Sequence, residues 1–476
     1  MLTAPAPEQN AFFGLSVSLS GDRAIVGSFE GDGSANAVPV FVRSGDAWAL
    51  DTELAITDGA TGDNCGRAVA LSGDRALVSA SGANLDGQLA VGAVYVFVRS
   101  GGVWTQEAKL TAPGGAAFSL FGHTLALSED RAVIGALGAE GGAAGTGRVY
   151  AFVRTGSDWA FESELVPLDA PNRLGTFAVA LSGNRALLSA LGNDEDPGND
   201  PFASGIGYVF VRSGSTWAQE DKLTVPDRLP TDGISQSLAL DGDRAVLGDR
   251  AVLGAPGEQD GRGAAYVFTR SGGEWTRQAR LEAAGTDASD AFGRAVATAG
   301  DRVFVGADRQ DDAPGTVYPF DRVAGVWTER PAIGASGASE PDGFGTALSL
   351  SGDRLLVGAN SEDRDGQGNV GAAYVFSDVF SVDAADAPAA SGLALSAPRP
   401  NPSAGGASLV LSVDVPQTVR AIVVDALGRE VRVLAGGEVS GEHTLRVDTA
   451  TLAPGAYTVR VTGADGVLAR RLTVVR

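Results

Sequence analysis

The sequence predicts an all-β protein: a seven-bladed β-propeller closed by N-terminal residues, followed by a small Ig-like antiparallel β-sandwich. Three observations lead to this fold class. One motif recurs seven times between Phe12 and Phe376, with a period of about 55 residues that is typical of repeat architectures. Each copy contains four β-rich runs separated by Gly-containing turns. The first residues of the chain resemble the missing end of the last copy.

Each copy predicts four antiparallel strands. Residues Ser16 to Ser20 alternate in polarity and are followed by Gly21-Asp22 and an apolar run from Arg23, which is the pattern of a hairpin with a tight turn. A third run ends at Ser-Gly, and a fourth begins at a tryptophan. Four strands in each of seven copies describe a propeller.

Three recurrent side chains are interpreted as parts of this frame. The tryptophans are expected to pack between strands or blades, because one Trp can bury roughly 150–250 Å². The tyrosines are expected to pack similarly, with their hydroxyls bonded to local partners. The arginine after each turn is expected to pair with a nearby carboxylate or carbonyl. The tryptophans are Trp48, Trp104, Trp159, Trp217, Trp275 and Trp327, and the arginines are Arg23, Arg75, Arg131, Arg185, Arg250, Arg302 and Arg354.

The two ends of the repeat array complement each other. Copy seven stops at Tyr374 to Ser377 without a tryptophan, whereas the chain starts with Met1 to Pro5, which resembles the end of copy two at Lys109 to Pro113. A solenoid would need capping repeats at both ends. We therefore expect residues 1–5 to complete blade seven. Copy five contains a six-residue duplication at 242–253, which predicts a longer or bulged hairpin there.

The composition divides the chain into three parts. We expect the propeller at 1–380, a linker rich in Ala, Asp, Pro and Ser at 381–397, and the sandwich at 398–476. Six short strands separated by Gly and Pro turns are predicted in the last part. They lie at 407–413, 418–424, 431–434, 443–447, 456–461 and 467–475.

The charge and the apolar pattern restrict the partners. A formal net charge of -22 argues against nucleic acid and anionic membrane surfaces. No apolar run approaches a membrane span, and no secretory signal peptide begins at Met1. The single cysteine, Cys65, occupies a position where other copies have Phe and is interpreted as a small core residue.

The sequence offers little for catalysis and one candidate for metal binding. His123 and His443 are the only histidines, so no catalytic grouping with His can be placed and no enzyme activity is expected. The loop after the second strand carries oxygen side chains at alternate positions before Gly in copies seven and one, a pattern that suits Ca²⁺. Asp, Asn and Gly are also ordinary turn formers, and this alternative stays open. The candidate calcium ligands are Asp363, Asp365, Asn369, Glu30, Asp32 and Asn36.

The repeats resemble the FG-GAP family. The resemblance rests on literal Phe-Gly pairs and on Gly254-Ala255-Pro256 in copy five. It implies the seven-bladed propeller of integrin α chains, in which several loops hold calcium. The Phe-Gly pairs begin at Phe13, Phe121, Phe292 and Phe344.

The last eighty or so residues resemble a type A C-terminal sorting domain of type IX secretion. The resemblance implies type IX secretion machinery as a partner, and a secreted location or one on the outer surface of a Gram-negative bacterium. Such cargo carries an N-terminal export signal, which is absent from this chain, so we expect the natural protein to extend beyond Met1. The matching motif residues are Pro400, Asn401, Pro402, Gly428, Gly455 and Tyr457.

The sequence therefore favours a secreted or surface-attached binding protein of the adhesion type. Variable loops on one face of a rigid ring would bind an extracellular protein or glycan. Two alternatives stay open. A carbohydrate-active enzyme would require carboxylates that converge at the channel mouth, and a structural surface-layer component would have flat, featureless loop faces.

Overall fold

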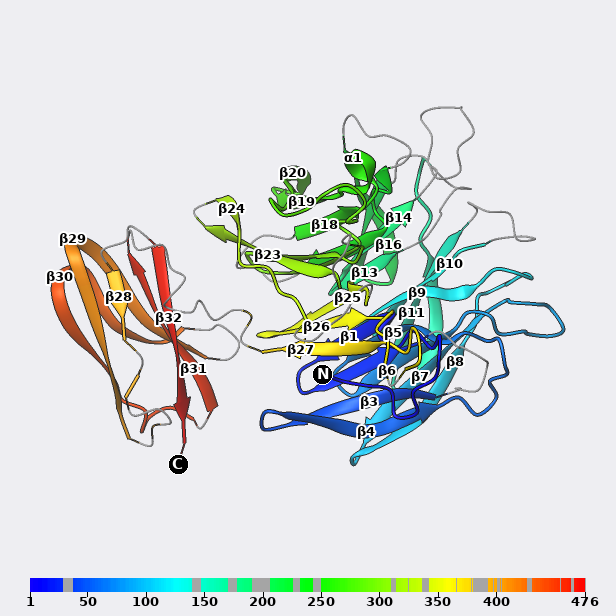
Figure 1. The fold of residues 1–476 in the computed structure, drawn as a ribbon, viewed down its shortest axis with the longest axis horizontal. Helices are drawn as coiled ribbons and strands as arrows, with labels where there is room; N and C mark the ends of the chain where they lie inside the picture. Colours follow the sequence, from blue (N-terminus) through cyan, green and yellow to red (C-terminus); the bar gives the residue numbers. More distant parts are fainter. Residues whose placement is uncertain are drawn as a thin grey trace. The chain divides into compact units, whose positions relative to one another are not determined.

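The chain forms two compact units, Met1–Ser377 and Asp378–Arg476 (Figure 1). The computed structural model describes residues 1–28, 37–138, 147–169, 178–190, 206–225, 232–242, 250–309, 314–323, 325–335, 342–364, 366–377, 379, 393–396, 398–399, 403, 405–425, 430–453, 455–463 and 466–475. Among these residues, no helix is long and apolar enough to cross a membrane.

The described residues of the first unit form seven antiparallel sheets, each built from strands that are consecutive in the sequence. The first two four-stranded sheets are β1 (Ser16–Ser20), β2 (Arg23–Gly27), β3 (Ala37–Ser44) and β4 (Ala47–Ala55), and then β5 (Cys65–Ser72), β6 (Arg75–Ala80), β7 (Ala93–Ser100) and β8 (Val103–Leu110). The third and fourth are β9 (Phe121–Ser128), β10 (Arg131–Ala136), β11 (Arg148–Thr155) and β12 (Asp158–Glu164), and then β13 (Val179–Ser182), β14 (Arg185–Ala190), β15 (Ile206–Ser213) and β16 (Thr216–Leu223). The fifth and sixth are β17 (Ser237–Asp241), β18 (Arg250–Ala255), β19 (Ala264–Ser271) and β20 (Glu274–Leu281), and then β21 (Ala295–Ala299), β22 (Arg302–Ala307), β23 (Thr316–Val323) and β24 (Val326–Glu329). The last sheet has three strands, β25 (Phe344–Ser351), β26 (Arg354–Ala359) and β27 (Ala372–Phe376). A short helical turn, α1 (Glu258–Gly261), lies between β18 and β19.

The burial of each strand follows its sequence. The second strand is a nearly continuous apolar run, and in β6 every residue after Arg75 is buried, as expected of a strand covered on both faces. The fourth strand is polar and largely exposed, as in β8. The first and second strands are joined by two-residue turns in which glycine has positive φ, 58° at both Gly21 and Gly73, as tight hairpins require.

Neighbouring sheets pack through their first strands. The first strand of each sheet contacts the first strand of the next, and β25 contacts β1, so the series of contacts returns to its start. Serine hydroxyls cross these interfaces: the backbone N–H of Leu71 donates to Ser18 Oγ, and that of Leu19 donates to Ser349 Oγ, both at 2.9 Å. This arrangement is a β-propeller.

Two glycine positions of the repeat meet at the same interfaces, one at the end of the second strand and one near the start of the first strand of the next sheet. A Cβ on Gly27, at the end of β2, would lie 2.0 Å from the carbonyl oxygen of Gly66 in the next sheet. The same approach joins Gly358 of the last sheet to Gly14 near the start of the chain, also at 2.0 Å. Because real Cβ atoms do not approach an oxygen so closely, these positions require glycine.

The N-terminal residues pair with the last sheet as the sequence predicts. Leu2 forms an antiparallel bridge with Ala373 of β27, with N···O distances of 2.6 and 3.0 Å. In the second sheet the equivalent pair is Val94 with Leu110. Leu2 is 3% exposed and packs in one cluster with Phe13, and the chain start lies beside β27 in Figure 1. Leu2 therefore takes the place in the last sheet that Leu110 has in the second.

Two further predictions for the first unit concern Cys65 and the duplication in copy five. Cys65 is a buried core residue, as predicted. In copy five, β18 uses the second half of the duplicated segment, and Asp241 pairs directly with Arg250. The predicted bulge or extension falls on residues 243–249, which lie outside the described residues.

The second unit is all-β but has longer strands than the sequence predicts. Its strands are β28 (Leu393–Leu395), β29 (Ala407–Asp425), β30 (Glu430–Val447), β31 (Gly455–Gly463) and β32 (Gly466–Val474). They form one hydrogen-bonded sheet in the order β28-β29-β31-β32, with β30 also paired to β29.

Three boundary predictions in this unit were wrong. The strands predicted at 407–413 and 418–424 are one strand, β29, because pairing with β30 continues past a register shift between Val413 and Gln417, which a bulge accommodates. The strands predicted at 431–434 and 443–447 likewise merge into β30. The predicted linker extends too far, because Leu393–Leu395 form β28 and Leu395 is buried in the core.

We predict that Leu2→Ala lowers the free energy of unfolding of the first unit by about 2–3 kcal/mol, as for other buried leucines. All six tryptophans lie between Trp48 and Trp327, so tryptophan fluorescence during urea denaturation reports on this unit alone. Leu50→Ala is the matched control, because Leu50 is 45% exposed. Equal stability of the two variants would contradict a closing role for Leu2.

Candidate functional site

The two edges of the sheets in the first unit differ in the length of their connections. At one edge, the turns from first to second strand and from third to fourth strand have two residues, as between Ser72 and Arg75 and between Ser100 and Val103. The connection from β17 to β18, which holds the duplication, is longer. At the other edge lie described connections, among them 56–64, 81–92, 111–120 and 256–263. We call these the turn edge and the long-loop edge.

The turn edge is held together by ion pairs between sheets. Arg23 reaches Asp74 of the next turn at 3.2 Å, and Arg75 reaches Asp130 at 3.4 Å. Across the chain ends, Arg354 of the last sheet reaches Asp22 of the first at 3.3 Å. The predicted pairing of these arginines with nearby carboxylates is thus present in these sheets. Each pair is half exposed and contributes little alone, but together they align successive turns.

A second set of contacts joins the fourth strands. The indole N–H of Trp159 donates to Glu107 Oε2 at 2.9 Å, and Arg154 donates to the same carboxylate at 2.7 Å. Burial works against ionisation of Glu107, but the hydrogen bonds from Arg154 and Trp159 hold its pKa below the ordinary value.

The same indole bond recurs around the unit, so the predicted packing role of the tryptophans holds with an addition. The acceptor is always three residues after the tryptophan of the preceding sheet. Our sequence interpretation missed these acceptors, although the spacing is visible in the sequence. The recurring bonds are Trp104 to Asp51, Trp217 to Glu162, Trp275 to Glu220 and Trp327 to Gln278.

At the long-loop edge, tyrosines tie loops to the sheets. Tyr266 donates its hydroxyl to Glu258 at 2.6 Å, and Arg280 donates to the same carboxylate at 2.6 Å. Burial, together with Glu258, raises the pKa of Tyr266 to about 12. Tyr374 likewise donates to Glu362 at 2.7 Å. The bases of these loops are therefore fixed, and these hydroxyls have the local partners that the sequence predicts.

The structure describes only part of the predicted calcium sites. In copy seven, the backbone N–H of Asn369 donates to Asp363 Oδ1 at 2.8 Å, and the Asn369 side chain donates to Asn10 at 3.1 Å. Copy two has the same turn, in which Ala90 N–H donates to Asn84 Oδ1 at 2.8 Å. The neutral Asn84 thus makes the bond that Asp363 makes, which suits a turn-forming role. Asp365, Glu30, Asp32 and Asn36 lie outside the described residues.

In the described part of the chain, no group of three or more His, Cys, Asp or Glu side chains is placed to hold a metal ion. His443 Nε2 lies 2.9 Å from the carbonyl oxygen of Ser440. Burial, with a smaller effect of the Arg67 charge, lowers the pKa of His123 to about 4.

The structure describes two of the sorting-motif residues, Tyr457 and Gly455. Tyr457 is 9% exposed, pairs with Leu472, and donates its hydroxyl to the carbonyl oxygen of Ala453 at 2.9 Å. Gly455 begins β31 opposite Val474 with φ of 156°. Pro400, Asn401, Pro402 and Gly428 lie outside the described residues.

The fold and its recurring interfaces define a repeat protein of the propeller class. The FG-GAP repeat model matches residues 1–42, 48–97, 104–152, 217–268, 275–320 and 327–376, more than half of the chain, and the chain belongs to the FG-GAP repeat family. Residues 400–475 match the secretion system C-terminal sorting domain. This tail implies handling by type IX secretion and indicates a secreted or cell-surface protein.

Comparisons with curated proteins and solved structures do not extend the family assignment. No curated protein matches the chain. The crystal structure of Saccharomyces cerevisiae Sqt1 is similar with 11% sequence identity and a TM-score of 0.45, over 92% of this chain and 98% of that chain.

We predict that His123 makes the first unit sensitive to acid. Because the pKa of His123 falls from 6.5 in the unfolded chain to about 4, the unfolded state binds the proton first, and stability is lost as the pH falls from 6.5 towards 4. His123→Thr, which installs the residue of copy seven at Thr346, should reduce this loss. Urea denaturation at pH 7 and pH 4.5, followed by tryptophan fluorescence, measures it. A pH dependence identical to that of the parent would contradict the prediction.

Proposed function

We propose that the first unit is a seven-bladed propeller, closed by residues 1–5, that binds an extracellular protein or glycan through its long-loop edge without catalysing a reaction. The second unit is proposed to be an Ig-like sandwich that the type IX machinery of a Gram-negative bacterium recognises. Secretion would then place the propeller outside the cell or on its surface.

The difference between the two edges is the observation that carries this proposal. Two-residue turns such as Gly73-Asp74 leave almost no backbone to contact a ligand, whereas connections such as 81–92 and 111–120 can vary in length and sequence. Loops on a rigid scaffold are where binding residues concentrate in other folds. The long-loop edge is therefore the favoured binding surface.

The contacts between neighbouring sheets support recognition because they join strands and do not involve the long loops. Neighbouring sheets are joined at the first strands by Ser18 and Ser349, and at the fourth strands by bonds such as that from Trp159 to Glu107. The loop bases are held by tyrosines such as Tyr266. A ligand would then meet pre-organised loops, which reduces the entropy lost on binding.

The proposal is tested with the full chain on an array of extracellular glycans and surface proteins. A ligand bound as proposed should lose affinity through Leu89→Ser at the long-loop edge and keep it through Val103→Ser at the turn edge. Both side chains are exposed, at 56% and 63%, so neither change should unfold the protein. A ligand lost through Val103→Ser alone would overturn the choice of edge.

Calcium binding at the copy-seven loop is a separate proposal with its own test. If Asp363 is a ligand, calorimetric titration with Ca²⁺ should give heat, and the Tm should rise relative to a sample with chelator. Asp363→Asn should abolish both responses. If the carboxylate only forms the turn, Asp363→Asn should leave the Tm unchanged, because Asn84 forms the equivalent turn in copy two, and Ca²⁺ should have no effect.

A further inference from the structure

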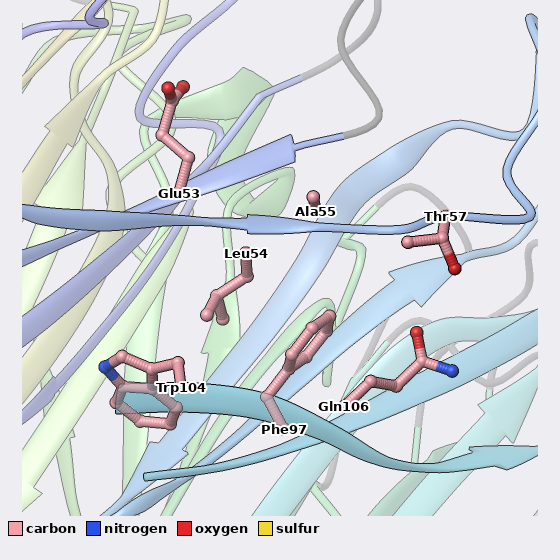
Figure 2. Close-up of a pocket in the computed structure, with 7 residues that line it drawn as sticks. All are labelled: Glu53, Leu54, Ala55, Thr57, Phe97, Trp104 and Gln106. Carbon is pink, nitrogen blue, oxygen red and sulfur yellow. The ribbon is translucent and has the colours of Figure 1, made fainter. Parts of the chain in front are cut away.

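A groove lies between the outer strands of the first two sheets, apart from the features used above. Its volume is about 360 Å³, at the lower end of the range of ligand pockets, roughly 300–1,000 Å³. Figure 2 shows Leu54 and Thr57 on one side, facing Trp104, Phe97 and Gln106 on the other. Glu53 and Ala55 also border the groove, but their side chains point to the opposite side of β4 (Figure 2).

The lining combines an apolar floor with a neutral polar end. Leu54 and Phe97 are buried, at 1% and 3% exposure, and Trp104 is half-buried. The indole N–H of Trp104 donates to Asp51 at 3.3 Å, which fixes the orientation of its ring. Thr57 and Gln106 are exposed and supply a hydroxyl and an amide. Among the described lining residues Glu53 is the charged one, and its side chain points to the other side of β4.

The equivalent interfaces show why this groove is open. In two of these interfaces, the residue two positions after the tryptophan bonds to the segment that follows the fourth strand of the preceding sheet. Gln219 accepts the backbone N–H of Leu168 at 2.9 Å, and Glu329 accepts that of Ala284 at 3.1 Å. These two bonds fasten the segment over the interface.

In the other two interfaces a bulky side chain occupies this position. Phe161 packs edge-to-face on Phe152 with centroids 6.0 Å apart. The guanidinium of Arg277 lies 6.0 Å from the ring centroid of Tyr266. Gln106 holds the same position in the second sheet, and Thr57 matches Leu168 and Ala284. Among the described residues, Gln106 and Thr57 do not form the fastening bond, so both line an open groove instead.

We propose that this groove is a binding site for a neutral saccharide unit. The C–H groups on one face of a pyranose ring can pack on the half-buried Trp104, since aromatic rings offer a large apolar surface, with Phe97 and Leu54 as the floor beneath it. The hydroxyls at the edge of the ring can bond to the Gln106 amide and to Thr57, whose counterparts elsewhere are used within the chain. An acidic sugar is disfavoured by the net charge of -22. Apart from Thr57, which lies at the start of the 56–64 connection, the site is built from strands, and it does not use the 81–92 loop that carries Leu89.

The test uses saturation-transfer NMR with the full chain and four neutral probes: maltohexaose, cellohexaose, mannohexaose and chitohexaose. At least one probe should receive saturation from the protein. Gln106→Phe, which installs the residue of copy three, should fill the groove and weaken that binding by roughly tenfold or more, as expected when the lining contacts of a small site are lost. Gln106→Leu, which removes the amide and keeps the bulk, should weaken it less.

Two controls separate this site from others. Thr105→Ala changes an exposed neighbour whose side chain points to the other face of β8, and it should leave binding unchanged. Leu89→Ser, at the long-loop edge, should also leave it unchanged. Saturation of none of the probes overturns the proposal. So does binding that survives Gln106→Phe or that is lost through Leu89→Ser.

Discussion

The close backbone approach between neighbouring sheets is the constraint on which the first unit depends. Gly27 and Gly358 each come so near to a glycine carbonyl of the next sheet that a Cβ would overlap it. In the contact between Gly358 and Gly14, the Gly-Ala pair at 358–359 and the Phe-Gly pair at 13–14 are thus two sides of one contact. Because the contact between Gly358 and Gly14 is the same as that between Gly27 and Gly66, the chain ends meet through the standard interface. The ion pair of Arg354 with Asp22 and the pairing of Leu2 then follow from the same register.

The sequence predicted the strands of the first unit well because each is bounded by a local signal. A tight turn containing Gly ends the first strand, and Ser-Gly ends the third, so periodicity and turn chemistry agree. In the second unit these signals were misleading. Pro416 and the pair Gly436-Gly437 mark turns in the sequence, yet β29 and β30 continue past them, because two long strands paired along their length can absorb irregularities as register shifts.

The candidate site was less predictable because its contacts join residues about 50 positions apart. The oxygen-bearing side chain three residues after the tryptophan in each of the first five copies was visible in the sequence, but its partner depends on how one sheet sits on the next. The loops raise a different difficulty. Oxygen side chains at alternate positions, as around Asp363, serve a turn and a cation equally well, and the bond to Asn369 shows the first of these uses. Local patterns therefore predicted elements more reliably than roles.

The fourth strand also shows how a propeller can change its surface without changing its frame. A tryptophan and an oxygen-bearing side chain three positions later recur in the first five sheets, because they hold neighbouring sheets together. The residue two positions after the tryptophan takes no part in the indole bonds, and it is Gln106, Phe161, Gln219, Arg277 or Glu329 in sheets two to six. Each choice fastens, fills or opens the space beside the indole at little expense to the interface. Binding properties can therefore vary at this one position while the close contacts between sheets stay the same.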